Sequence, residues 1–146
     1  KFTERQKAVY NAVLNVMKEA TNMLAPGLLF EEYNKEVGKI MTKELIGLGL
    51  LTETDVKNQD PNNPAYRKYF MHGTSHFLGI DVHDVGYFNK PIQENMCFTV
   101  EPGIYIPKEN LGIRLENNII VQSGGNNDLM KNIPLEADEI ETLMNS

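Results

Sequence analysis

The sequence has no tryptophan, a single cysteine and few basic residues. Because Cys97 is the only cysteine, no intramolecular disulfide can form, and without a recognisable secretory signal we expect a cytoplasmic location. No apolar run approaches the length of a membrane-spanning helix. The 14 basic residues against 20 acidic ones give a net charge of -6, which argues against a nucleic acid or a membrane surface as the main partner.

What the sequence does contain is enough apolar side chain for one globular domain, since 41% of its 146 residues are hydrophobic. No internal repeat, low-complexity segment or second domain is recognisable in it. The chain begins at Lys1 rather than at Met, so we expect it to be a piece of something longer.

Helical periodicity dominates the first third of the chain. Thr3 and Gln6 have the spacing of a capping box, and apolar residues then recur at helical intervals as far as Leu24. A second amphipathic stretch over 30–48 predicts a helix antiparallel to the first. The polar stretch 52–68, which contains two prolines, is typical of a surface loop.

The pattern becomes strand-like after this loop. Runs rich in β-branched and aromatic residues at 69–71, 97–100, 104–106 and 119–121 predict an antiparallel sheet. Acidic residues in the first turn and apolar spacing predict a short closing helix over 134–144. The order of the elements predicts a single α+β unit with helices packed on one face of a curved sheet.

All three histidines of the chain, His72, His76 and His83, fall within twelve residues. On a strand His72 and His76 point to the same face, whereas His83 is an odd step away and requires a bend, for which Gly79 is suited. A helical interpretation is weakened by Gly73 and Gly79. One histidine alone is most often a core or solvated residue, but the cluster indicates a site where neutral imidazole binds a divalent metal ion.

Two glutamates interrupt apolar strands, and both are candidate metal ligands. Glu101 lies in an apolar run directly before Pro102-Gly103, and Glu116 lies in a second run. A glutamate on a half-exposed strand ordinarily faces solvent, because an unpaired buried carboxylate is costly, but a divalent cation would remove that cost. Arg114, two residues before Glu116, shares its strand face and can order a carboxylate or bind substrate.

These residues lie in motifs that resemble the Xaa-Pro aminopeptidase (aminopeptidase P) branch of the pita-bread (creatinase/aminopeptidase-like) metallopeptidases. The resemblance covers essentially all 146 residues. Its main segments are His72-Gly73-Thr74-Ser75-His76, Val82-His83-Asp84-Val85-Gly86, Thr99-Val100-Glu101-Pro102-Gly103-Ile104-Tyr105 and Gly112-Ile113-Arg114-Leu115-Glu116-Asn117.

The resemblance implies a centre of two divalent ions, commonly manganese, with zinc, cobalt or iron as alternatives. His76 matches the family's histidine ligand, Glu101 its first glutamate ligand and Glu116 its bridging glutamate. His72 and His83 match residues that bind substrate and stabilise the tetrahedral intermediate. Arg114 matches an arginine that orders the site, which gives His72, His83, Glu101 and Arg114 as the catalytic candidates.

The resemblance also implies two aspartate ligands on strands upstream of the first helix, and this chain starts after that point. We therefore expect residues 1–146 to be the C-terminal part of the catalytic domain, without its first strands and without a preceding N-terminal domain. With three of five ligands, the chain should hold at most one metal ion, weakly, and be inactive alone. The sheet edge left by the missing strands predicts a homo-oligomer.

For the parent protein we expect a peptidase that removes the N-terminal residue from peptides with proline in second position. Two cations would activate a water molecule, Glu101 would carry its proton to the leaving amine, and His83 would support the oxyanion. Three alternatives stay open: prolidase or methionine aminopeptidase of the same fold, a non-catalytic peptide-binding module, or an α+β domain with incidental histidines.

Overall fold

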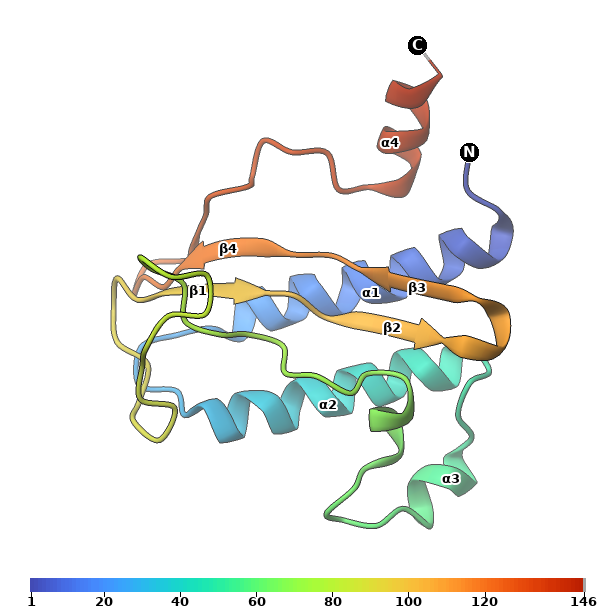
Figure 1. Cartoon of the computed structure of the whole chain (residues 1–146), viewed down its shortest axis with the longest axis horizontal. Coiled ribbons are helices and arrows are strands. Elements are labelled where there is room, and N and C mark those ends of the chain that lie inside the picture. Colours follow the sequence, from blue (N-terminus) through green and yellow to red (C-terminus); the bar gives the residue numbers. More distant parts are fainter. Residues whose placement is uncertain (146) are drawn as a thin grey trace.

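The computed structural model describes residues 1–145 as two long helices beneath a twisted ribbon of strands. A short helix at the C-terminal end of the chain lies close in space to the N-terminus (Figure 1). The helices are α1 (Glu4–Met23), α2 (Phe30–Gly47), α3 (Glu53–Lys57) and α4 (Ala137–Met144). The strands are β1 (Cys97–Val100), β2 (Gly103–Ile106), β3 (Leu111–Arg114), β4 (Asn117–Ile120) and β5 (Asn127–Asp128). None of the described helices combines the length and apolarity needed to cross a bilayer.

The predicted capping box at the start of α1 is confirmed. The Thr3 hydroxyl accepts a hydrogen bond from the Gln6 amide at 3.2 Å, and the Gln6 side chain accepts one from the Thr3 amide at 2.9 Å. α1 then runs antiparallel to α2, as predicted (Figure 1). Their facing sides are apolar and fully buried, including Val13 of α1 and Met41 of α2.

The strands form two antiparallel sheets, ordered β1-β4-β5 and β2-β3. The last pair of the first sheet is Val100 with Asn117, and the first pair of the second is Gly103 with Arg114. Residues 101–102 on one side and 115–116 on the other therefore separate the two sheets. Because these two gaps are equally long, both sheets belong to one continuous ribbon with a single pairing register. The ladder is interrupted at Pro102, which has no amide hydrogen to donate.

The two faces of this ribbon differ in chemistry because side chains alternate along each strand. Phe98, Val100, Ile104 and Ile119 are fully buried on the face that packs against the helices. The other face carries Glu101 and the residues that share its strand parity. The predicted α+β class, with helices covering one face of the sheet, is confirmed (Figure 1).

Three expectations need correction. The strand predicted at 69–71 is wrong, because Tyr69 ends a short 3-10 helix at Ala65–Lys68 and makes only a single backbone bond to β2, from the Tyr105 amide at 2.9 Å. The predicted loop 52–68 contains α3 and this 3-10 helix. The closing helix begins at Ala137 rather than at Pro134.

Candidate metal centre

The histidine-bearing segment lies in an extended conformation beside β1. Three backbone hydrogen bonds hold it there: Glu101 N–H to Thr74 O at 2.8 Å, Thr99 N–H to His76 O at 3.1 Å, and Leu78 N–H to Cys97 O at 3.1 Å. Phe77 and Phe98 form its one β-bridge within the described residues. The segment is therefore extended without being a named strand, and it places His76 beside Thr99, two residues from Glu101.

His76, Glu101 and Glu116 meet at the interruption of the ribbon. Each offers one ligand atom, and these atoms all lie within 4.8 Å of one another. His76 Nε2 lies 3.1 Å from Glu101 Oε1, and the two side chains are only 18% and 13% exposed. Glu116 is more exposed, and the register places it directly opposite Glu101. The break in the ladder thus brings two acids and an imidazole to one point.

The hydrogen bonds of His76 define its tautomer. Its Nδ1 lies 2.9 Å from the carbonyl oxygen of Phe77. Because a carbonyl only accepts, Nδ1 carries the hydrogen, and in the neutral ring the lone pair is on Nε2, which faces Glu101. A backbone carbonyl that fixes the far nitrogen is the usual arrangement behind a metal-binding histidine. One imidazole with two carboxylates is a donor set suited to a borderline or hard divalent ion.

Arg114 stands at the rim of this cluster. It shares a strand face with Glu116, as expected, but its contact is diagonal: Nη1 lies 3.7 Å from Glu101 Oε2. Half of the Arg114 side chain is exposed, so solvent weakens this ion pair. The guanidinium group is therefore placed to orient Glu101 while still facing outward.

His83 lies against His76, with the ring centroids 4.4 Å apart and the planes at 63°. It projects from an exposed loop that Asp84 closes. The Asp84 carboxylate accepts hydrogen bonds from the amides of Ile80 at 2.9 Å and Val85 at 2.8 Å. The Asp84 amide also donates to the Phe77 carbonyl at 3.1 Å, the same oxygen that fixes His76.

His72 lies farther along the same face and contacts Tyr105 rather than the carboxylates. Its Nε2 is 2.8 Å from the Tyr105 hydroxyl, and its Nδ1 is 2.9 Å from the Gly73 carbonyl. Tyr105 was not among the predicted site residues. The sequence could have indicated it, because Tyr105 lies four residues after Glu101 and side chains at even spacing on a strand point to the same face. Gly103, which lies between them, leaves room for the Tyr105 ring.

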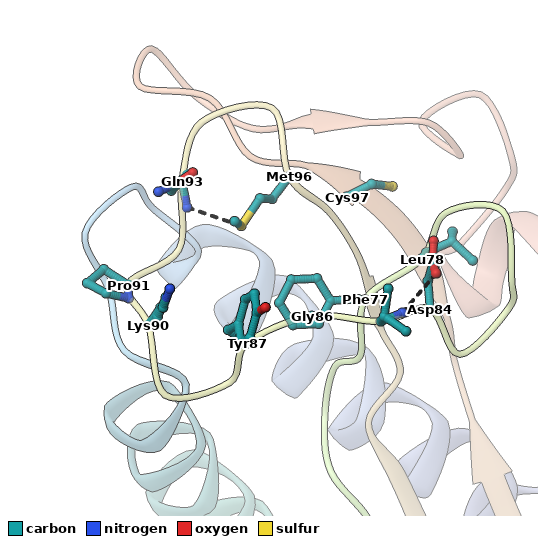
Figure 2. A pocket seen from close by; sticks show the side chains of 11 residues that line it. Phe77, Leu78, Asp84, Gly86, Tyr87, Lys90, Pro91, Gln93, Met96 and Cys97 are labelled. Atoms are coloured by element: carbon teal, nitrogen blue, oxygen red, sulfur yellow. Dashed lines mark hydrogen bonds between the residues drawn. The ribbon is translucent and has the colours of Figure 1, made fainter.

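A cavity of about 640 Å³ opens beside the His83 loop (Figure 2). Phe77, Leu78, Met96 and Cys97 provide much of its apolar lining, and Tyr87 and Lys90 lie on its other side. The Lys90 ammonium lies 4.5 Å from the centre of the Tyr87 ring. Burial raises the pKa of the Cys97 thiol, which leaves it protonated and weakly nucleophilic.

Comparison with known proteins identifies the family. The profile of metallopeptidase family M24 matches residues 1–123. The chain belongs to this family. It is 38% identical to a Xaa-Pro aminopeptidase of Haemophilus influenzae and 37% identical to that of Escherichia coli, each over 99% of this chain. The predicted resemblance is therefore confirmed.

The solved structures agree. Zinc-substituted Escherichia coli aminopeptidase P in complex with product superposes with a TM-score of 0.87 at 38% identity, over 99% of this chain and 35% of that one. The fold is accordingly the pita-bread fold of family M24. The M24 chain spans about a third of the length of the curated relatives, 36% and 35% of the Haemophilus and Escherichia proteins.

Proposed function

We propose that this chain is the C-terminal part of the catalytic domain of an Xaa-Pro aminopeptidase. The observation that carries the proposal is the convergence of His76, Glu101 and Glu116 within 4.8 Å, in an M24 chain whose relatives are Xaa-Pro aminopeptidases. The substrate would be a peptide with proline in second position, and the products would be its free N-terminal residue and the remaining peptide, which begins with proline.

The three residues fit a divalent ion by their chemistry and their geometry, and manganese is the proposed native metal. In the whole protein two ions would be held by this set and by two aspartates from upstream strands. Residues 1–146 alone would then hold at most one ion, weakly, because part of the negative ligand charge is missing. For the same reason we propose that this chain alone is inactive.

The chain's own residues have distinct roles in the proposed reaction. When bound, the metal ions lower the pKa of a water molecule and polarise the scissile carbonyl. Glu101 accepts the proton of that water and passes it to the leaving amine. His83 donates a hydrogen bond to the developing oxyanion, and His72 contributes to binding the substrate. Arg114 restrains the Glu101 carboxylate so that its lone pairs stay directed at the site.

Titration of the purified chain with Mn²⁺ in a calorimeter tests the metal site. We expect a single weak site that His76→Ala and Glu116→Gln both abolish. Glu36→Gln is the matched control, because Glu36 pairs with Lys39 on the surface of α2, away from the cluster. Mn²⁺ binding that survives His76→Ala unchanged contradicts the site, and two tight sites contradict the proposed loss of ligands.

An assay for release of the N-terminal residue from an Xaa-Pro peptide tests the activity. The chain with Mn²⁺ should release no more product than Mn²⁺ alone, while Escherichia coli aminopeptidase P serves as the positive control. A rate for the chain close to that of the control overturns the proposed inactivity. The same assay on the chain joined to the upstream strands should restore turnover on Xaa-Pro peptides.

We also propose that the chain self-associates. Within residues 1–145, β3 pairs with β2 on one side and has no strand on the other. An open strand edge presents free amide and carbonyl groups to a second chain. The proposed assembly is a homo-oligomer joined across this edge.

A further inference from the structure

Thr99 lies between the two most buried members of the cluster, and its hydroxyl contacts both. Oγ1 accepts a hydrogen bond from the His76 amide at 3.1 Å and donates one to Glu101 Oε1 at 3.3 Å. The latter oxygen is the one that lies 3.1 Å from His76 Nε2. One hydroxyl therefore joins the backbone of one candidate ligand to the carboxylate of another.

The direction of these bonds follows from the chemistry of the groups. An amide N–H can only donate, so the Thr99 oxygen accepts from His76 and its own hydrogen is free for a second partner. The carboxylate of Glu101 can only accept when ionised, so this hydrogen goes to Oε1. That bond holds one oxygen of Glu101 in place.

The Thr99 hydroxyl is itself held in place by the burial and the backbone of its strand. Thr99 is 1% exposed, and its neighbours Phe98 and Val100 are fully buried in the core. A β-branched side chain in a strand has restricted χ1, so the hydroxyl has little freedom to turn elsewhere. Water does not compete at such depth, and a lost bond would leave a buried donor without a partner.

We propose that Thr99 is a positioning residue for the metal site, which sets the mutual geometry of His76 and Glu101 through its hydroxyl. The inference rests on the proposed function, because it assumes that these two residues bind a divalent ion. Removing a hydrogen-bonding partner behind a metal ligand typically weakens metal affinity 10- to 100-fold. Thr99→Val removes the hydroxyl and keeps the shape, and Thr99→Ser keeps the hydroxyl and removes the methyl group.

Titration of the purified chain with Co²⁺, followed by its visible absorption, tests the proposal, because the spectrum reports coordination geometry as well as affinity. We expect Thr99→Val to weaken Co²⁺ binding about 10- to 100-fold and to alter the spectrum, and Thr99→Ser to restore both. The matched control is Thr42→Val, which removes a hydroxyl that donates to the Gly38 carbonyl inside α2. Circular dichroism verifies that each variant is folded.

The outcomes separate this inference from the function on which it rests. If His76→Ala abolishes Co²⁺ binding and Thr99→Val leaves it unchanged, the role of Thr99 is overturned and the site stands. If Thr99→Ser binds Co²⁺ as weakly as Thr99→Val does, the methyl group and not the hydroxyl determines the affinity, which also overturns the role of Thr99. If His76→Ala has no effect, the metal site itself fails.

Amide hydrogen exchange at His76 provides a readout that needs no metal ion. The His76 amide donates to Thr99, so Thr99→Val should raise its exchange rate several-fold, whereas Thr99→Ser and Thr42→Val should not. An unchanged His76 exchange rate in Thr99→Val overturns the proposal even if Co²⁺ binds too weakly to measure.

Discussion

The Tyr105 hydroxyl lies 2.8 Å from His72 Nε2 and donates to it, because the Gly73 carbonyl can only accept and therefore assigns the His72 hydrogen to Nδ1. This carbonyl accepts from Nδ1 at 2.9 Å. We predict that Tyr105→Phe changes the ratio of the two neutral tautomers about 2- to 13-fold, the equivalent of about 0.5–1.5 kcal/mol for one hydrogen bond. Histidine ¹⁵N shifts measure this ratio, and Tyr69→Phe is the control.

Gly103 should control the same bond indirectly. A Cβ at this position would lie 2.6 Å from the Tyr105 hydroxyl oxygen, so the ring must move. We predict that Gly103→Ala shifts the His72 tautomer ratio in the same direction as Tyr105→Phe. A tautomer ratio equal to that of the unchanged chain would show that the Tyr105 ring can move and still keep its hydrogen bond with His72.

The His83 loop should be sensitive to a single methyl group at Gly79. A Cβ there would lie 1.9 Å from Asp84 Oδ2, the oxygen that accepts from the Ile80 amide. We predict that Gly79→Ala costs about 0.5–1.5 kcal/mol of unfolding free energy in urea denaturation, because Asp84 must turn away and lose its hydrogen bond from the Ile80 amide. Gly124→Ala is the control, because Gly124 also lies outside the helices and strands and nothing lies within 4 Å of its Cβ position.

The cause of that cost can be isolated with a double variant. If the clash with Asp84 is responsible, adding Gly79→Ala to Asp84→Ala should cost less than Gly79→Ala costs in the unchanged chain. Strictly additive costs for the two substitutions would place the strain elsewhere in the loop.

Tyr33 should make the fold sensitive to alkaline pH. It is fully buried on α2, and burial raises the pKa of its phenol above the ordinary value of about 10, although a hydrogen bond with Ser75 at 3.0 Å partly offsets this. The unfolded chain therefore loses this proton first. Its stabilising contribution is complete below about pH 10 and is lost as the pH rises above that value.

We predict that Tyr33→Phe makes the unfolding free energy decline less steeply with pH above about 10 than it does in the unchanged chain. At neutral pH the variant should lose about 0.5–1.5 kcal/mol, because the bond to Ser75 is gone. Urea denaturation at a series of pH values checks both. Tyr87→Phe, at a 70% exposed position, should retain the steep decline.

Self-association should depend on chain concentration. If the open edge of β3 joins two chains, light scattering should give a mass that rises from that of the 16.6 kDa monomer as the concentration increases. A monomer mass that stays constant up to high concentration would contradict the proposed assembly.

The sequence predicted the elements whose signals are local. The α1 capping box depends on residues three positions apart, and the strands around Glu101 depend on alternation and on Pro102. The run at 69–71 misled because three apolar residues cannot distinguish a strand from an extended segment. The strand 111–114 was not among the predicted runs, because its glycine and arginine dilute the apolar pattern, and only Arg114 was expected on a strand, together with Glu116.

The site was predictable in its residue types and less so in its contacts. Alternation placed Arg114 on the face of Glu116, but only the pairing of the strands reveals that it reaches Glu101. Thr99 and Tyr105 act through hydroxyl groups whose partners come from the histidine segment, far away in the sequence. No pattern within one strand carries that information, because hydrogen bonds of this kind arise from tertiary packing.

Because the two sheets share one register, the lengths of the hairpin strands determine how the two acids of the hairpin are positioned relative to each other. Glu101 and Glu116 lie opposite each other only while the strand lengths on both sides match. A residue inserted between Glu101 and Ile106 would turn one carboxylate toward the helices, whereas a change within the Pro107–Asn110 turn that preserves the pairing would leave both in place. In this hairpin, spacing is therefore as strict a requirement as side-chain identity.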